Sequence, residues 1–164
     1  MRVRRTTSRE YLRKPRTRAV ATVELAFIMP VLLLFLFGII EFGLLFKDSL
    51  VLQEAAREGA RVAALGAPPP RIREVVQSSA PTLGQDNLSI EMQYRTWEGA
   101  GWSDWCSLGV ATDNSSNNAP PGSQVRVRVE YAHPLITGGL FSWMATNKDN
   151  NTVTLRSSAI ARRE

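Results

Sequence analysis

Few residues of this sequence have the types and spacing that catalysis needs. It contains one histidine, His133, and one cysteine, Cys106, which excludes a metal site built from several His or Cys ligands and an intrachain disulfide. Phosphate-binding loops, the metalloprotease motif HExxH and the nucleophile elbow GxSxG are all missing. We therefore expect no enzyme, no cofactor, no metal and no small-molecule substrate, and His133, just before Pro134, is expected to end a strand.

Two acidic residues, Glu24 and Glu41, interrupt a segment that otherwise suits a membrane. An ionised carboxylate at the centre of a spanning helix costs about 2.5 to 3.5 kcal/mol, and less toward the interface. For Glu41, snorkelling at the interface and a role in assembly remain equal alternatives. For Glu24, a cut after Ala19 would expose an amine on Val20, and the carboxylate could pair with that amine on a neighbouring subunit.

An apolar run extends from Leu25 to Phe46; Glu24 directly precedes it and Glu41 lies within its last third. As a helix it would be about 33 Å long, close to the ~30 Å hydrocarbon core of a bilayer, and it is too long for a cleavable secretory signal. Residues 1–18 contain eight basic residues and one acidic residue. The positive-inside rule explains this arm more simply than nucleic-acid binding does. It predicts a single-pass protein with a cytoplasmic N-terminus and an extracytoplasmic remainder.

Helical periodicity continues beyond the membrane to about Leu65. Ala55, Gly59 and Ala63 lie four residues apart and form a face of small side chains, which permits close approach of another element. We expect this face to contribute to assembly. Gly66 and the prolines at 68–70 end the helix, because proline has no amide donor and glycine tolerates the left-handed cap.

The remaining sequence predicts a small α+β domain. Residues 71–79 have the pattern of a short helix, and residues 88–95 alternate as a half-buried strand does. Residues 125–131 alternate more clearly, and residues 153–161 complete the set. Three or four antiparallel strands packed on the long helix would bury one face of the sheet.

A long loop rich in Gly, Ser, Asn and Pro separates the first two strong strands. Trp97, Trp102 and Trp105 lie in or beside it. We expect these rings to pack over the sheet, and the alternative is a surface that binds a glycan or another subunit. Cys106 is expected to be buried, because an exposed free thiol is open to oxidation; an intermolecular disulfide is the alternative.

The order and spacing of two stretches resemble the TadE-like family of pilin-like proteins. The first has Val-Glu at residues 23–24, an apolar run with Pro30, and Gly-Ile-Ile-Glu-Phe-Gly at residues 38–43. The second is Ala-Ala-Arg-Glu-Gly-Ala-Arg at residues 55–61. The resemblance covers about residues 18 to 65 and continues more weakly at residues 125–135.

This resemblance implies a minor pilin or pseudopilin of the tight-adherence, Flp-type pilus apparatus, made as a precursor with a basic leader. It implies partners in the membrane: a prepilin peptidase that cuts between Ala19 and Val20, other pilin-like subunits and the assembly machinery. Family members usually have Gly at the last leader position, where this chain has Ala19.

We accordingly divide the chain into a basic cytoplasmic leader at 1–19, a transmembrane and extended helix at 20–66, and an extracytoplasmic α+β domain at 67–164. The expected location is the cytoplasmic (inner) membrane, with entry into the pilus as a further option. The rival hypothesis is an uncleaved, signal-anchored extracytoplasmic binding or adhesion module. An exported hydrolase is disfavoured, because His133 is the only imidazole.

Overall fold

The computed structural model describes residues 17–112 and 114–164. They fall into two compact units, Met1–Gly38 and Ile39–Glu164, and the boundary between the units lies inside the first helix, α1, which runs over Thr17–Ala64. The predicted basic leader at 1–19 lies outside the described residues except for its last three positions.

The described part of the first unit is the N-terminal portion of α1. Its side chains from Val20 to Phe37 are exposed and mostly apolar. Pro30 lies inside the helix without ending it, as membrane helices tolerate. Among the described residues, α1 is the one helix long and apolar enough to cross a membrane. This helix therefore indicates a single-pass membrane protein.

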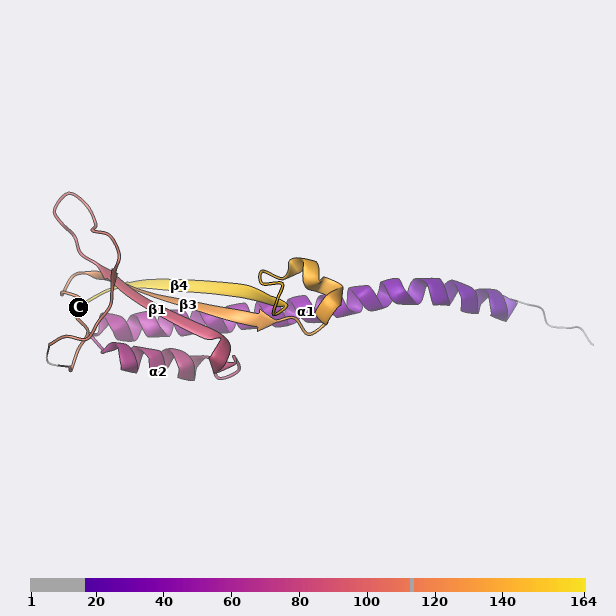
Figure 1. The fold of residues 1–164 in the computed structure, drawn as a ribbon, viewed down its shortest axis with the longest axis horizontal. Coiled ribbons are helices and arrows are strands. Elements are labelled where there is room, and N and C mark those ends of the chain that lie inside the picture. The colour runs from indigo at the N-terminus through magenta and orange to yellow at the C-terminus, as the bar shows by residue number, and fades with distance from the viewer. Residues whose placement is uncertain (1–16, 113) are drawn as a thin grey trace, which may run out of the picture. The chain divides into compact units, whose positions relative to one another are not determined.

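The second unit is a four-stranded antiparallel sheet with helices on one face (Figure 1). The strand order is β2-β1-β3-β4, and the C-terminal part of α1 and helix α2 together cover the sheet. The elements after α1 are α2 (Pro69–Ser79), η1 (Gln85–Asn87), β1 (Leu88–Arg95), β2 (Cys106–Ser107), β3 (Gln124–Pro134), η2 (Gly138–Met144) and β4 (Thr152–Arg162).

The core forms where β3 faces the two helices. Val125, Val127 and Val129 alternate along β3, and each has no exposed surface. Their partners include alanines of α1 together with Ile72 and Val76 of α2. The alternation buries one face of the strand and leaves the other for polar side chains, as the period of two residues requires.

Gly59 marks the closest approach of α1 to its neighbours. A Cβ atom built there would lie 2.5 Å from Cγ2 of Val76 and 3.2 Å from Cγ1 of Val127. Ala55 and Ala63, one turn away on either side, have no exposed surface. The small-residue face therefore brings α1 against α2 and β3 of its own chain.

The C-terminus of α1 is closed by glycine and by two distant polar side chains. Gly66 has φ +88°, and the amides of Gly66 and Ala67 bond to carbonyls of the last turn, which is the Schellman arrangement. Asn117 donates from Nδ2 to the carbonyls of Ala63 at 2.9 Å and Ala67 at 3.0 Å. Arg163 donates from Nη1 to Oδ1 of Asn117 at 2.6 Å, so the end of β4 fixes the loop that caps the helix.

The structure confirms the α+β class and the predicted elements. The helix end at about residue 65, the short helix and the three strong strands lie where the pattern placed them, with ends shifted by at most three residues. Arg61 donates to Glu58 at 2.6 Å, and this hydrogen bond lowers the pKa of Glu58. Strand β2 was not predicted, because two residues are too few to show a period.

Replacing Gly59 by alanine is expected to destabilise the second unit by about 1 to 3 kcal/mol through overpacking, despite a gain in helix propensity of up to about 1 kcal/mol. Val76 is β-branched and cannot retract its Cγ2 without a shift of α2. Gly43→Ala is the control, because a Cβ there meets nothing within 4 Å. Denaturant unfolding of the detergent-solubilised chain measures both, and equal stability of the two variants would contradict the close packing.

Candidate functional site

The carboxylate of Glu24 lies on the exposed surface of α1, one helical turn after Val20, which is 57% exposed. Ala19 belongs to the same helix. Within the described residues, no hydrogen bond or ion pair engages Glu24. An acidic side chain without a partner in residues 17–112 and 114–164, on an apolar stretch of helix, is available to a group from another molecule.

Glu41 is bound within its own chain. Its side chain is 1% exposed, and Oε1 accepts a hydrogen bond from the amide of Ile136 at 3.0 Å. Oε2 accepts from the amide of Thr137 at 3.2 Å and from its hydroxyl at 3.0 Å. Of the two alternatives left open for Glu41, snorkelling to a lipid interface does not fit this buried, hydrogen-bonded carboxylate. The carboxylate instead satisfies two backbone donors of the segment after β3.

Asp48 and His133 form a second buried polar contact between α1 and the end of β3. Their Oδ2 and Nδ1 atoms lie 2.7 Å apart, and the residues are 7% and 4% exposed. His133 is the penultimate residue of β3, so its prediction as a strand-end residue is confirmed. Within the described residues its Nε2 atom has no hydrogen-bond partner. The pair joins two elements and does not face solvent.

The small residues predicted for assembly lie in the core of the chain itself. Ala55 and Ala63 have no exposed surface, and Gly59 is buried beside Val76 and Val127. The element that approaches them is α2 and the sheet, so any effect on assembly passes through the shape of the domain.

The three tryptophans lie in the loop between β1 and β2 and divide into two kinds. Trp97 and Trp102 are 56% and 36% exposed, and their rings meet edge to face with centroids 5.5 Å apart. Trp105 is half-buried under two guanidinium groups, with the Cζ atoms of Arg95 at 4.6 Å and Arg126 at 4.0 Å from its ring centroid. Packing over the sheet therefore holds for Trp105, whereas the other two rings present surface to solvent.

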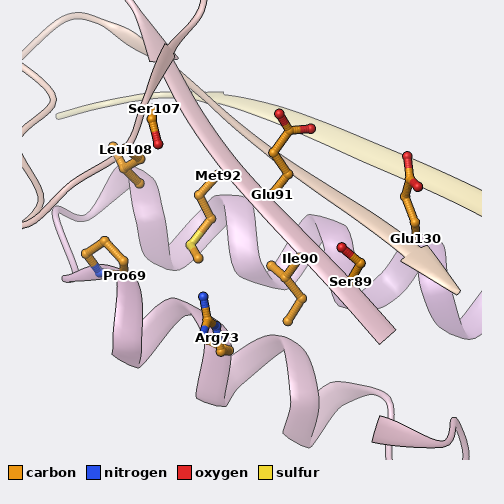
Figure 2. A pocket seen from close by; sticks show the side chains of 9 residues that line it. All are labelled: Pro69, Arg73, Ser89, Ile90, Glu91, Met92, Ser107, Leu108 and Glu130. Atoms are coloured by element: carbon orange, nitrogen blue, oxygen red, sulfur yellow. The ribbon is translucent and has the colours of Figure 1, made fainter. Parts of the chain in front are cut away.

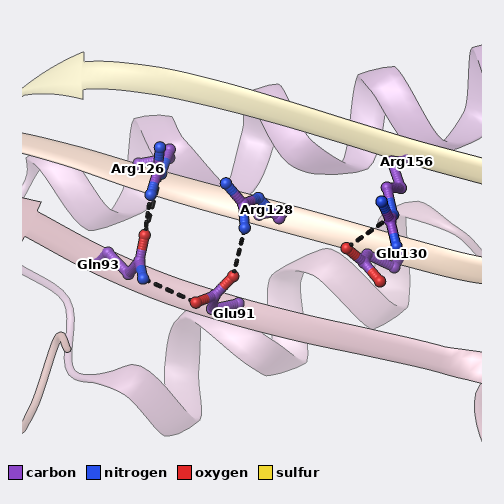
Figure 3. A network of polar contacts seen from close by, with 6 residues as sticks. All are labelled: Glu91, Gln93, Arg126, Arg128, Glu130 and Arg156. Carbon is purple, nitrogen blue, oxygen red and sulfur yellow. Dashed lines mark hydrogen bonds and ion pairs between the residues drawn. The ribbon is translucent and has the colours of Figure 1, made fainter. Parts of the chain in front are cut away.

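Charged side chains cross the outer face in pairs (Figure 3). Arg128 of β3 pairs with Glu91 of β1 at 2.9 Å, and Arg156 of β4 pairs with Glu130 at 3.0 Å. Arg126 differs, because it donates from Nε to the neutral amide oxygen of Gln93 at 3.1 Å.

Arg126 carries its charge in crowded surroundings. Desolvation lowers the pKa of its guanidinium, and the positive charges of Arg128 and Arg95 lower it further, against the opposing effect of Glu91. Sequence reasoning did not single out Arg95 and Arg126. The alternation of β1 and β3 placed both on the polar face, but only the register, in which Arg126 lies opposite Gln93, sets them beside Trp105.

Cys106 is exposed, contrary to the expectation of burial. It lies in β2, an edge strand of two residues that pairs with β1 alone. A strand this short at the margin of the sheet receives no covering layer, so both of its side chains remain accessible.

A cavity of about 500 Å³ opens between α2 and the edge of β1 (Figure 2). Arg73 reaches toward it from α2, Met92 and Ile90 lie on β1, and Leu108 closes one end. The single histidine of the chain does not line it. In residues 17–112 and 114–164, no three His, Cys, Asp or Glu side chains form a group that could hold a metal ion.

Glu41→Ala is expected to remove the acceptor of the part-buried amides of Ile136 and Thr137, at a cost of about 1.5 to 3 kcal/mol for hydrogen bonds to a charged group. Their hydrogen exchange should then accelerate by about tenfold or more, since local opening becomes easier. Glu24→Ala serves as the control. It removes a carboxylate of the same helix, and this carboxylate has no partner among the described residues. Unchanged exchange at both amides in Glu41→Ala would contradict the assigned hydrogen bonds.

The comparisons with known proteins bear on α1. No curated protein and no solved structure matches the chain. The family model described as TadE-like protein matches residues 19–61, the segment that holds Glu24, Glu41 and Gly59, and the predicted resemblance is thereby confirmed. The similarity to the TadE-like family covers residues 19–61, about a quarter of the chain.

Proposed function

We propose that this chain is a structural subunit, a minor pilin or pseudopilin, of a Tad, Flp-type pilus assembly system. The observation that carries the proposal is the TadE-like match over residues 19–61, because this segment coincides with the one described helix able to span a membrane. A helix that is exposed and apolar along its N-terminal portion needs lipid or other helices around it. A pilin-like subunit meets both environments, first in the membrane and then in an assembly.

The proposed location is the cytoplasmic membrane, with the basic N-terminal arm in the cytoplasm and the α+β domain outside. The charge asymmetry of the sequence supports this orientation, because residues 1–18 are strongly basic whereas Lys47 and Asp48 cancel at the other end of the apolar run.

Processing is the next step of the proposal. A prepilin peptidase would cut between Ala19 and Val20 and leave a new amine four residues before Glu24. In an apolar bundle the Glu24 carboxylate and the amine of a neighbouring subunit are each costly to bury alone, and they are far less costly as a pair. The absence of a described partner for Glu24 within its own chain supports this use of the side chain.

The role is structural rather than catalytic. The buried polar groups Glu41, Asp48 and His133 are engaged in contacts between elements. The serines at the α2–β1 cavity, Ser89 and Ser107, are not accompanied there by the single histidine, which general base chemistry of the serine hydrolase type would require.

Topology can be tested with the native thiol, because Cys106 is exposed. A membrane-impermeant maleimide added to intact spheroplasts is expected to label Cys106. In a host that lacks the prepilin peptidase, where the leader is retained, Ser8→Cys in a Cys106→Ser background should be labelled only after the membrane is permeabilised. Labelling of Ser8→Cys but not of Cys106 in intact spheroplasts would reverse the orientation.

Glu24→Gln tests the assembly step, because it keeps the shape of the side chain and removes its charge. Membrane insertion should be preserved or improved, whereas copurification with other pilin-like subunits should fall at least about tenfold, since a buried amine then lacks its partner. Glu54→Gln is the matched control, since Glu54 is an exposed acid of the same helix outside the apolar run.

The N-terminal sequence of the membrane-extracted protein separates this proposal from its rival. Cleavage before Val20 supports the pilin assignment. An intact N-terminus, together with normal subunit association in Glu24→Gln, favours an uncleaved signal-anchored binding module instead.

A further inference from the structure

The outer face of the sheet carries two arginines that lack acidic partners among the described residues. Arg95 donates from Nε to the amide oxygen of Gln124 at 2.9 Å, and Arg126 donates to that of Gln93. Their neighbours Arg128 and Arg156 each have a carboxylate within 3.0 Å (Figure 3). An amide fixes the direction of a guanidinium but does not neutralise its charge, and Glu91, which acts on Arg126, is itself paired with Arg128, so Arg95 and Arg126 add positive charge to one corner of the sheet.

The two guanidinium groups are also held in place by aromatic rings. Arg95 lies 4.6 Å from the Trp105 centroid and 5.2 Å from that of Trp102, and Arg126 lies 4.0 Å from Trp105. Cation–π contacts and amide hydrogen bonds restrict the side chains before any ligand arrives. An anion that binds there therefore meets donors already oriented, and less side-chain entropy is lost than with mobile arginines.

Exposed aromatic surface adjoins the charged groups. Trp97 and Trp102 are 56% and 36% exposed, and their rings meet edge to face. Indole faces open to water favour a ligand with a flat apolar face of its own. The corner thus offers oriented guanidinium donors and indole surface side by side.

From this juxtaposition we propose that Arg95, Arg126, Trp97 and Trp102 form a binding site for an acidic polysaccharide built from uronic acid units. A pyranose ring presents a flat face of C–H groups to an indole ring, and a uronate carries its carboxylate directly on that ring. One sugar residue therefore supplies both contacts, with the carboxylate bound by the planar fork of a guanidinium.

An acidic peptide fits the same corner less well. Its carboxylates are at the ends of flexible side chains, and ordering each glutamate costs rotamer freedom. It also brings backbone amides that need partners, whereas a sugar brings hydroxyls that water can bridge. The rigid link between ring and carboxylate therefore favours the uronate polymer.

The proposal can be tested by titrating the detergent-solubilised full chain with a short oligogalacturonate and following tryptophan fluorescence. The methyl-esterified form of the same oligosaccharide is the neutral control, and poly-L-glutamate is the peptide control. Oligogalacturonate should bind at least about tenfold more tightly than either control, because only it combines ring and charge. Its affinity should fall as salt is added, because the contacts are exposed.

Variants then assign the site. Arg126→Gln should weaken binding by about tenfold or more, whereas Arg128→Gln, whose guanidinium is already paired with Glu91, should change it by less than about twofold. Trp97→Ala should weaken binding without altering the unfolding midpoint, because the ring is exposed. If Arg126→Gln does not fold, Arg126→Lys replaces it and should weaken binding by losing the forked donors.

Three outcomes would overturn the proposal. They are equal binding of the esterified oligosaccharide, binding of poly-L-glutamate as tight as that of oligogalacturonate, and wild-type affinity in the folded Arg126 variant. The second outcome would assign the surface to an acidic protein partner. The site lies outside residues 19–61, so none of these results depends on the assignment of α1 to pilus assembly.

Discussion

The close approach of α1 to β3 and α2 is the constraint on which the rest of the fold depends. It requires a side chain no larger than a methyl group at Ala55 and Ala63 and none at Gly59. A larger residue would separate helix and sheet, and the separation would extend to every contact that bridges them. The small side chains fix the spacing between α1 and the sheet. That spacing allows the polar contacts at both ends of the interface to form.

Polar contacts made along α1 determine which register the close packing adopts. Glu41 binds the segment after β3, Asp48 binds His133 at the end of β3, and Asn117 caps the last turn of the helix. Buried and hydrogen-bonded polar groups contribute modest net stability, but a shifted register would leave each of them unpaired at a cost of about 1 to 3 kcal/mol. Apolar packing supplies the attraction, and these three contacts select one arrangement.

Hydrophobic periodicity and the residues that end helices predicted the elements of this fold from sequence. Both signals are local: the alanines of the helix that ends at Gly66, and the alternating valines of one strand. The partners of Glu41 and Asp48 could not be predicted, since they lie 85 or more residues away. The exposure of Cys106 and the position of Arg126 over Trp105 depend on the length of an edge strand and on strand register. Neither the length of that edge strand nor the strand register can be predicted from a single sequence.

The contact between Arg163 and the loop at Asn117 spans 46 residues, and the amide of Glu164 donates to the carbonyl of Ala64 at 3.2 Å. The cap at the end of α1 is therefore complete only once the residues that follow β4 are in place. During synthesis, α1, α2 and β1 are made first and remain without β4, which pairs along its whole length with β3. Until β4 has been made, the edge of β3 is open to other chains, so the delay between the two strands is the period in which wrong pairing is possible.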